Sequence, residues 1–135
     1  MIKSWIKSRA QKNLVRFVKS RYDVIKPIPK QGLFNRQCHN NSVEYSQIHD
    51  CGIVETIYID NGEPILHYLN TDNNGIFLET TLGWKAGTLE YYKIREIHSD
   101  DYFNISHEFI QSLESWTVQF LGWFGRKVLM IDRIV

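Results

Sequence analysis

The 135-residue sequence predicts an α+β domain, because helical and extended patterns occupy separate stretches of the chain. Two helical segments come first, a series of extended runs separated by turn residues follows, and a long amphipathic helix comes after them. The length fits one domain over residues 1–135. We therefore expect N-terminal helices packed on a small antiparallel sheet.

The N-terminal segment is basic and amphipathic. Residues 1–36 hold ten lysines or arginines and one acid (+9), whereas residues 37–135 hold six bases and fourteen acids (−8). An apolar stripe predicts a helix that docks on the rest of the domain. The stripe consists of Ile2, Ile6, Ala10, Leu14 and Phe17. Pro27 and Pro29 end it and begin a linker, so residues 1–30 form a basic helix and linker. The cations are either a solvated helix face or a footprint for nucleic acid.

A second helix is predicted over roughly residues 37–49. The apolar residues Val43, Tyr45 and Ile48 are compatible with a helix, which predicts that the helix starts at Cys38 even though weak helix formers follow the cysteine. It ends at DCG, where Gly52 can take the left-handed conformation. A thiol in the first turn of a helix lies near unpaired N–H groups and the positive end of the helix dipole, which favour the thiolate.

The middle of the chain predicts antiparallel strands. DNGE (60–63) is a hairpin turn and TDNNG (71–75) joins the next pair of strands. The extended runs are IVETIYI, PILHYLN, GIFLETT and TLEYYKIREI.

Residues 104–135 predict a C-terminal helix and a strand. Six apolar residues share one helical face: Phe109, Ile110, Leu113, Trp116, Phe120 and Leu121. Gly122 and Gly125 end the helix. The tail KVLMIDRIV predicts a final strand.

The hairpin at TDNNG suggests a catalytic pair. If it closes symmetrically about Asn73, His67 and Glu79 lie directly opposite one another on one face of the sheet. The carboxylate can then fix the tautomer of the imidazole. Cys38, His67 and Glu79, in that chain order, supply the nucleophile, base and orienting group of a thiol triad.

Three segments within residues 31–103 carry a family resemblance: RQCHNNSVEY, GIVETIYIDNGEPILHYLN and NGIFLETTLGW. They resemble a family of small bacterial and phage cysteine hydrolases of the papain-like and transglutaminase-like type. The family pattern is Cys-x-x-Asn-small, then His-aromatic, then Gly-x-x-x-Asp-x-Thr. The resemblance implies a papain-like core with Cys38 as nucleophile, His67 as base and Glu79 as third member, although Glu79 stands where Asp or Asn is expected.

The resemblance also implies supporting residues. Asn41 and Ser42 lie behind the nucleophile. Tyr68 stands where Trp is commoner and is a candidate residue of the substrate groove. Gln31 or Gln37 supplies a side-chain donor to an oxyanion hole, and Gln31 is preferred because it lies further upstream. Separately, Trp84 follows the strand that carries Glu79, and it is a candidate either for the wall of a substrate groove or for the core.

Composition narrows the partners. No apolar run reaches the length of a membrane span and the N-terminus is charged too regularly for a secretory signal, so we expect a cytoplasmic protein, in the host cytoplasm if phage-encoded. No organic cofactor is expected. A metal is not expected either, because the spacing of the four candidate ligands matches no common zinc pattern. They are Cys38, His39, His49 and Cys51.

The predicted function is a thiol-dependent hydrolase or acyl transferase acting on an amide, peptide or related carbonyl. The partner would be a peptide or small-molecule substrate. One alternative is a non-catalytic descendant of this fold, such as a phage-encoded regulator that binds a host protein or small ligand. Another alternative is a nucleic-acid-binding protein that uses the basic N-terminal arm.

Overall fold

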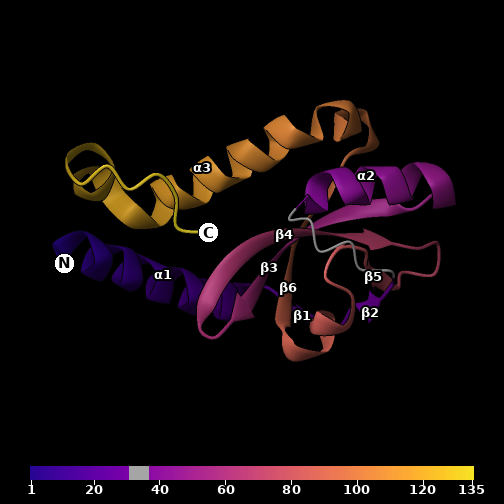
Figure 1. Cartoon of the computed structure of the whole chain (residues 1–135), viewed down its shortest axis with the longest axis horizontal. Coiled ribbons are helices and arrows are strands. Elements are labelled where there is room, and N and C mark those ends of the chain that lie inside the picture. Colours follow the sequence, from indigo (N-terminus) through magenta and orange to yellow (C-terminus); the bar gives the residue numbers. More distant parts are fainter. Residues whose placement is uncertain (31–36) are drawn as a thin grey trace.

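The computed structural model describes residues 1–30 and 37–135 and has the predicted mixture of helices and an antiparallel sheet (Figure 1). The α-helices are α1 (Ile2–Arg21), α2 (Cys38–His49) and α3 (Ile105–Trp123). The strands are β1 (Val24–Ile25), β2 (Ile28–Pro29), β3 (Gly52–Asp60), β4 (Glu63–Thr71), β5 (Phe77–Glu79) and β6 (Glu90–Ile97). Two 3₁₀ helices and a π-helical turn complete the elements: η1 (Gly83–Thr88), η2 (Ser99–Asn104) and η3 (Phe124–Val128).

Six strands form one sheet in the order β1-β6-β3-β4-β5-β2. All pairs are antiparallel except β2 with β5. The β3–β4 hairpin closes at Asn61 and Gly62, which both have positive φ (55° and 80°), as a type I′ turn requires. The predicted turn at DNGE is therefore present.

Helix α3 runs along the molecule, so that its C-terminal part lies beside α1 at one end and its N-terminal part lies beside α2, which covers the other end of the sheet (Figure 1). Helix α1 docks through Ala10, Leu14 and Val18, which are buried against α3 and strands of the sheet. Ile2 was expected in this stripe, but it is 59% exposed. It lies one turn beyond the last residue that the body covers.

Helix α2 begins at Cys38, as predicted. Its end differs from the prediction. Asp50 takes the left-handed conformation (φ 54°, ψ 51°), and Gly52 is already the first residue of β3. An aspartate tolerates this conformation because its short polar side chain can bond locally.

The C-terminal tail is not a strand. Helix α3 is interrupted at Gly122 (φ 79°, ψ 173°), and residues 129–135 form no ladder with the sheet. Ile131 and Ile134 are instead buried in the core between α1 and α3. The side chain of Gln11 donates to the carbonyl of Ile134 at 3.0 Å, which ties the tail to α1. The apolar residues of the tail are therefore buried between helices and do not belong to a strand of the sheet.

No helix in the described part of the chain is long and apolar enough to span a bilayer.

Candidate active site

Cys38 is the first residue of α2, in the position that activates a thiol. The N-cap is Gln37, and the first N–H groups of a helix have no carbonyl partner within the helix. Cys38 is 6% exposed and packs with Ile53, Tyr68 and Ile97. The helix start therefore holds a buried free thiol against the sheet.

His67 and Glu79 are in direct contact at the buried face of β4 and β5. Nε2 of His67 lies 2.8 Å from Oε2 and 3.0 Å from Oε1 of Glu79. His67 is 4% exposed and Glu79 is fully buried. Because Glu79 occupies Nε2, the other ring nitrogen, Nδ1, is the one that can face Cys38.

The predicted register of this hairpin was wrong by one residue in its centre. Strands β4 and β5 pair Asn70 with Leu78. The same register, extended by one residue, places Leu69 opposite Glu79. His67 and Glu79 are therefore diagonal neighbours. The turn explains the shift. Oδ1 of Asp72 accepts from the backbone of Asn74 and Ile76 at 2.9 Å each, and the turn centres on Asn74 instead of Asn73.

Diagonal neighbours keep both side chains on one face of the sheet, since side chains alternate with a period of two. The prediction that the pair shares a face is therefore confirmed even though direct opposition is not.

Glu79 is fully satisfied by hydrogen bonds. Its Oε1 accepts from the backbone N–H groups of Thr81 (3.0 Å) and Leu82 (3.1 Å), and its Oε2 accepts from the hydroxyl of Tyr91 (2.6 Å). Strand β6 is three places from β5 in the sheet order, so Tyr91 reaches Glu79 because the sheet curls. The carboxylate is held in one orientation toward His67.

Cys38 and His67 each stabilise the charged form of the other, which favours a thiolate–imidazolium ion pair. Burial would raise the pKa of Cys38, but the positive charge of His67 and hydrogen bonds from His39, His67 and the Tyr68 backbone lower it to about 6. Burial would lower the pKa of His67, but the Cys38 charge and hydrogen bond, with Glu79, raise it to about 10. Between these values the site holds a thiolate and an imidazolium.

Glu79 stays ionised beside this pair. Burial would raise the pKa of its carboxyl, but the hydrogen bond and charge of His67, with the bonds from Tyr91 and Leu82, hold it below its ordinary value.

Buried amides fasten α2 to the hairpin. Asn41, predicted as a support residue, donates from its side chain to the hydroxyl of Thr81 at 3.0 Å. Asn70 donates to the carbonyls of Ser42 (2.9 Å) and Gly52 (3.2 Å) and accepts from Thr80 at 3.0 Å. These bonds fix the helix start relative to the strands that carry His67 and Glu79.

The two candidate oxyanion-hole glutamines have different outcomes. Gln31 lies outside the described residues. Gln37 is exposed, and its side-chain oxygen accepts from the side chain of Asn40 at 3.5 Å. Its role as a donor stays a prediction.

A cavity of about 430 Å³ contains the candidate nucleophile and base. Its wall is mainly apolar, and its charged residues are Asp60, Lys85 and Arg133. Lys85 and Asp60 are paired at 3.4 Å. The apolar wall consists of Tyr58, Ile65, Leu66, Leu82, Phe109, Leu113 and Val135.

The two residues predicted for the groove do not line this cavity. Trp84 is 74% exposed on η1. Tyr68 is fully buried and packs edge-on against Phe109 at 5.3 Å between ring centroids. A larger hollow, of about 950 Å³ between α2 and η2, contains neither Cys38 nor His67.

Three residues near the site were missed or misassigned from sequence. His39 was considered only as a metal ligand, but it hydrogen-bonds the thiol and stacks on Phe109 at 5.0 Å. Tyr91 and Asn70 looked like ordinary strand residues. The one usable signal was Asn70 itself, because a buried strand rarely holds an amide without a specific partner.

Within residues 1–30 and 37–135, no group of three or more His, Cys, Asp or Glu side chains is arranged to hold a metal ion. Comparisons with known protein families, with curated proteins and with solved structures gave no match.

Proposed function

We propose that the protein is a cysteine hydrolase or acyl transferase that acts on an amide, peptide or related carbonyl through Cys38, His67 and Glu79. One observation carries the proposal. A thiol at a helix start meets an imidazole in a cavity, and a fully hydrogen-bonded carboxylate holds that imidazole from behind.

The first step is attack of the Cys38 thiolate on the carbonyl carbon. Negative charge moves to the carbonyl oxygen, where backbone N–H groups at the start of α2 can stabilise it. His67 then gives its proton to the leaving amine as the carbon–nitrogen bond breaks, which leaves a thioester on Cys38 and a neutral imidazole.

The second step returns the enzyme to its starting state. His67 takes a proton from water, and the resulting hydroxide attacks the thioester. The carboxylic acid product leaves, and Cys38 is again a thiolate beside an imidazolium. An amine or hydroxyl acceptor in place of water would give acyl transfer with the same residues. Glu79 orients His67 throughout and is a positioning residue.

The cavity favours an acyl group with an apolar side chain. Tyr58, Leu82 and Phe109 provide apolar surface in the cavity that the thiol also lines.

The test is the pH profile of iodoacetamide labelling, followed by peptide mapping of each cysteine. Labelling of Cys38 should be half-maximal near pH 6, whereas Cys51 should need alkaline pH, because burial and the charges of Asp72 and Asp50 raise the pKa of Cys51. The profile is more decisive than the rate, since a thiolate of low pKa is intrinsically less nucleophilic.

Variants connect the profile to the triad. His67→Ala should move the Cys38 profile to alkaline pH, because burial then dominates the pKa of the thiol. Glu79→Gln should move it less, because Glu79 acts through the imidazole. Cys51→Ser should leave it unchanged. A wild-type Cys38 that titrates like an ordinary thiol would contradict the proposal and favour a non-catalytic binding protein of the same fold.

A further inference from the structure

The exposed side of α1 carries a groove built from cations and one tryptophan. Trp5, Arg9, Lys12 and Arg16 follow one another at spacings of four, three and four residues, which places them on one face of the helix. With Ser8 and Asn13 they line a groove of about 290 Å³. We call these six residues the basic groove.

The aromatic ring at one end of the groove is open to solvent. Trp5 is 60% exposed, and the guanidinium of Arg9 lies 5.5 Å from the centre of its ring. Trp5 has no packing role in the core, because the side of α1 that packs against the core is opposite to the side that carries Trp5.

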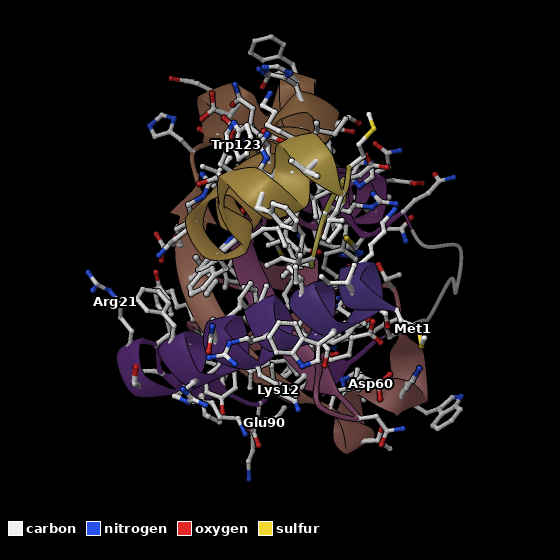
Figure 2. All side chains as sticks on the ribbon, turned by 90° about the vertical axis from the view of Figure 1, so that its left-hand side faces the viewer. Met1, Lys12, Arg21, Asp60, Glu90 and Trp123 are labelled. Atoms are coloured by element: carbon white, nitrogen blue, oxygen red, sulfur yellow. The ribbon has the colours of Figure 1, made fainter. Side chains whose placement is uncertain are left out.

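The charge of the groove is not neutralised by the body. Helix α1 holds seven lysines and arginines and no acid. Figure 2 looks onto this side, with α1 across the front between Met1 and Arg21, and Asp60 and Glu90 below it. Asp60 pairs with Lys85, and Glu90 lies 3.9 Å from Lys19.

Among the residues that the structure describes, no carboxylate forms an ion pair with a groove cation. The cations Arg9, Lys12 and Arg16 are all exposed. They therefore form a line of open positive charge about 10 Å long, at about 1.5 Å of rise per residue.

The geometry favours a nucleic-acid strand over a membrane surface. A helix that lies in a bilayer interface buries an apolar face in lipid, but the apolar face of α1 is already buried through Ala10, Leu14 and Val18. A line of unpaired cations can follow a phosphate backbone, and an exposed tryptophan offers a stacking surface for an unpaired base.

We propose that the basic groove binds single-stranded nucleic acid, with phosphates on Arg9, Lys12 and Arg16 and a base on Trp5. This site is distinct from the thiol chemistry, and it stands or falls separately from the proposed function. The groove lies on α1, whereas the nucleophile, base and carboxylate lie on α2, β4 and β5.

The experiment is fluorescence anisotropy of the full chain with end-labelled single-stranded and duplex oligonucleotides of the same length, over a series of salt concentrations. Three phosphate contacts predict that log K falls with log salt with a slope of roughly −2. The triple variant Arg9→Gln, Lys12→Gln, Arg16→Gln should weaken binding at least about tenfold and bring the slope close to zero. Trp5→Ala should weaken single-strand binding by about tenfold, because it removes the stacking surface for one base.

The matched control removes the same charge elsewhere. Lys3→Gln, Lys26→Gln, Lys127→Gln changes three exposed lysines outside the groove. Retained binding in this control, with loss in the groove variant, supports the proposal. Equal loss in both triples would overturn it in favour of net charge.

Two further outcomes would also overturn the proposal. One is no binding of any oligonucleotide at low salt. The other is groove-dependent binding to vesicles of phosphatidylserine and phosphatidylcholine without binding to oligonucleotides. Circular dichroism of each variant checks that α1 is still folded, which is expected because all substituted side chains are exposed.

Discussion

Glu79 is one methylene longer than the aspartate or asparagine that the family resemblance leads one to expect. The register accounts for the longer side chain. Directly opposed residues have Cβ atoms about 4.5–5.5 Å apart, whereas diagonal neighbours are about 7–8 Å apart. His67 and Glu79 are diagonal, and a glutamate is long enough to reach Nε2 at 2.8 Å.

Glu79→Asp should therefore impair the site although it keeps the charge. The carboxylate would retract by up to about 1.5 Å, the length of one carbon–carbon bond. We expect the Cys38 labelling profile to shift toward alkaline pH, because His67 loses an interaction that raises its pKa. The measurement is the pH profile of alkylation for wild type, Glu79→Asp and Glu79→Gln. A wild-type profile in the Glu79→Asp variant would show that the reach of the side chain is unimportant.

The hydroxyl of Tyr91 should matter to both stability and reactivity. Tyr91→Phe removes a buried donor to Glu79 at 2.6 Å, so we expect a loss of about 1.5–3 kcal/mol in the free energy of unfolding. Urea denaturation measures this loss. Tyr92→Phe is the matched control, because Tyr92 is the next residue on β6 and packs in the core on the other face of the sheet. Only Tyr91→Phe should alter labelling of Cys38.

At the scale of elements, sequence patterns predicted what is local. Apolar patterns and turn residues located α1, α2, α3, β3, β4, β5 and β6. They could not find β1 and β2, since strands of two residues have no period. The tail was misassigned because a short apolar run is equally compatible with a strand and with a plug between helices.

The same limit applies to the site. Cys38, His67 and Glu79 could be predicted because their chemistry is distinctive and their spacing implied one hairpin face. Tyr91 could not, because its contact depends on the curl that brings β6 round to Glu79. Long-range closure of the sheet is a property of the whole fold and leaves no local pattern.

Docking of α1 can be tested at one position. Leu14 is fully buried in the core between α1 and α3, so Leu14→Ala should lower the free energy of unfolding by about 2–5 kcal/mol. Ile2→Ala is the control, because Ile2 is 59% exposed and its loss should change stability by less than about 0.5 kcal/mol. Urea titration of both variants gives the comparison. Equal, small effects would mean that α1 is not docked in solution.

At the scale of the molecule, folding moves a proton from sulfur to nitrogen. In the unfolded chain at neutral pH, Cys38 is a thiol and His67 is mostly neutral, with ordinary pKa values of 9.0 and 6.5. In the folded chain the thiolate and the imidazolium coexist between about pH 6 and about pH 10. The number of bound protons is then the same in both states over the middle of this range.

This exchange predicts how stability depends on pH. A lowered Cys38 pKa contributes stability above 9.0, and that contribution is lost as pH falls through about 6. A raised His67 pKa contributes stability below 6.5, and that contribution is lost as pH rises through about 10. The two slopes cancel between 6.5 and 9.0, where the pair should give a plateau.

The plateau can be isolated by subtraction. Denaturation of wild type and of the triple variant Cys38→Ala, His67→Gln, Glu79→Gln at a series of pH values gives a difference curve from which titrating groups outside the site largely cancel. Glu79 is removed as well because its pKa depends on His67. The difference should be flat from 6.5 to 9.0 and then fall toward about 10, because the unfolded thiol ionises while the folded His67 keeps its proton. A difference curve that falls steadily from 6.5 would mean that His67 is protonated without a thiolate beside it. Between 6.5 and 9.0 the stability of Cys51→Ser should parallel that of wild type, since the Cys51 thiol is protonated in both the folded and the unfolded chain there.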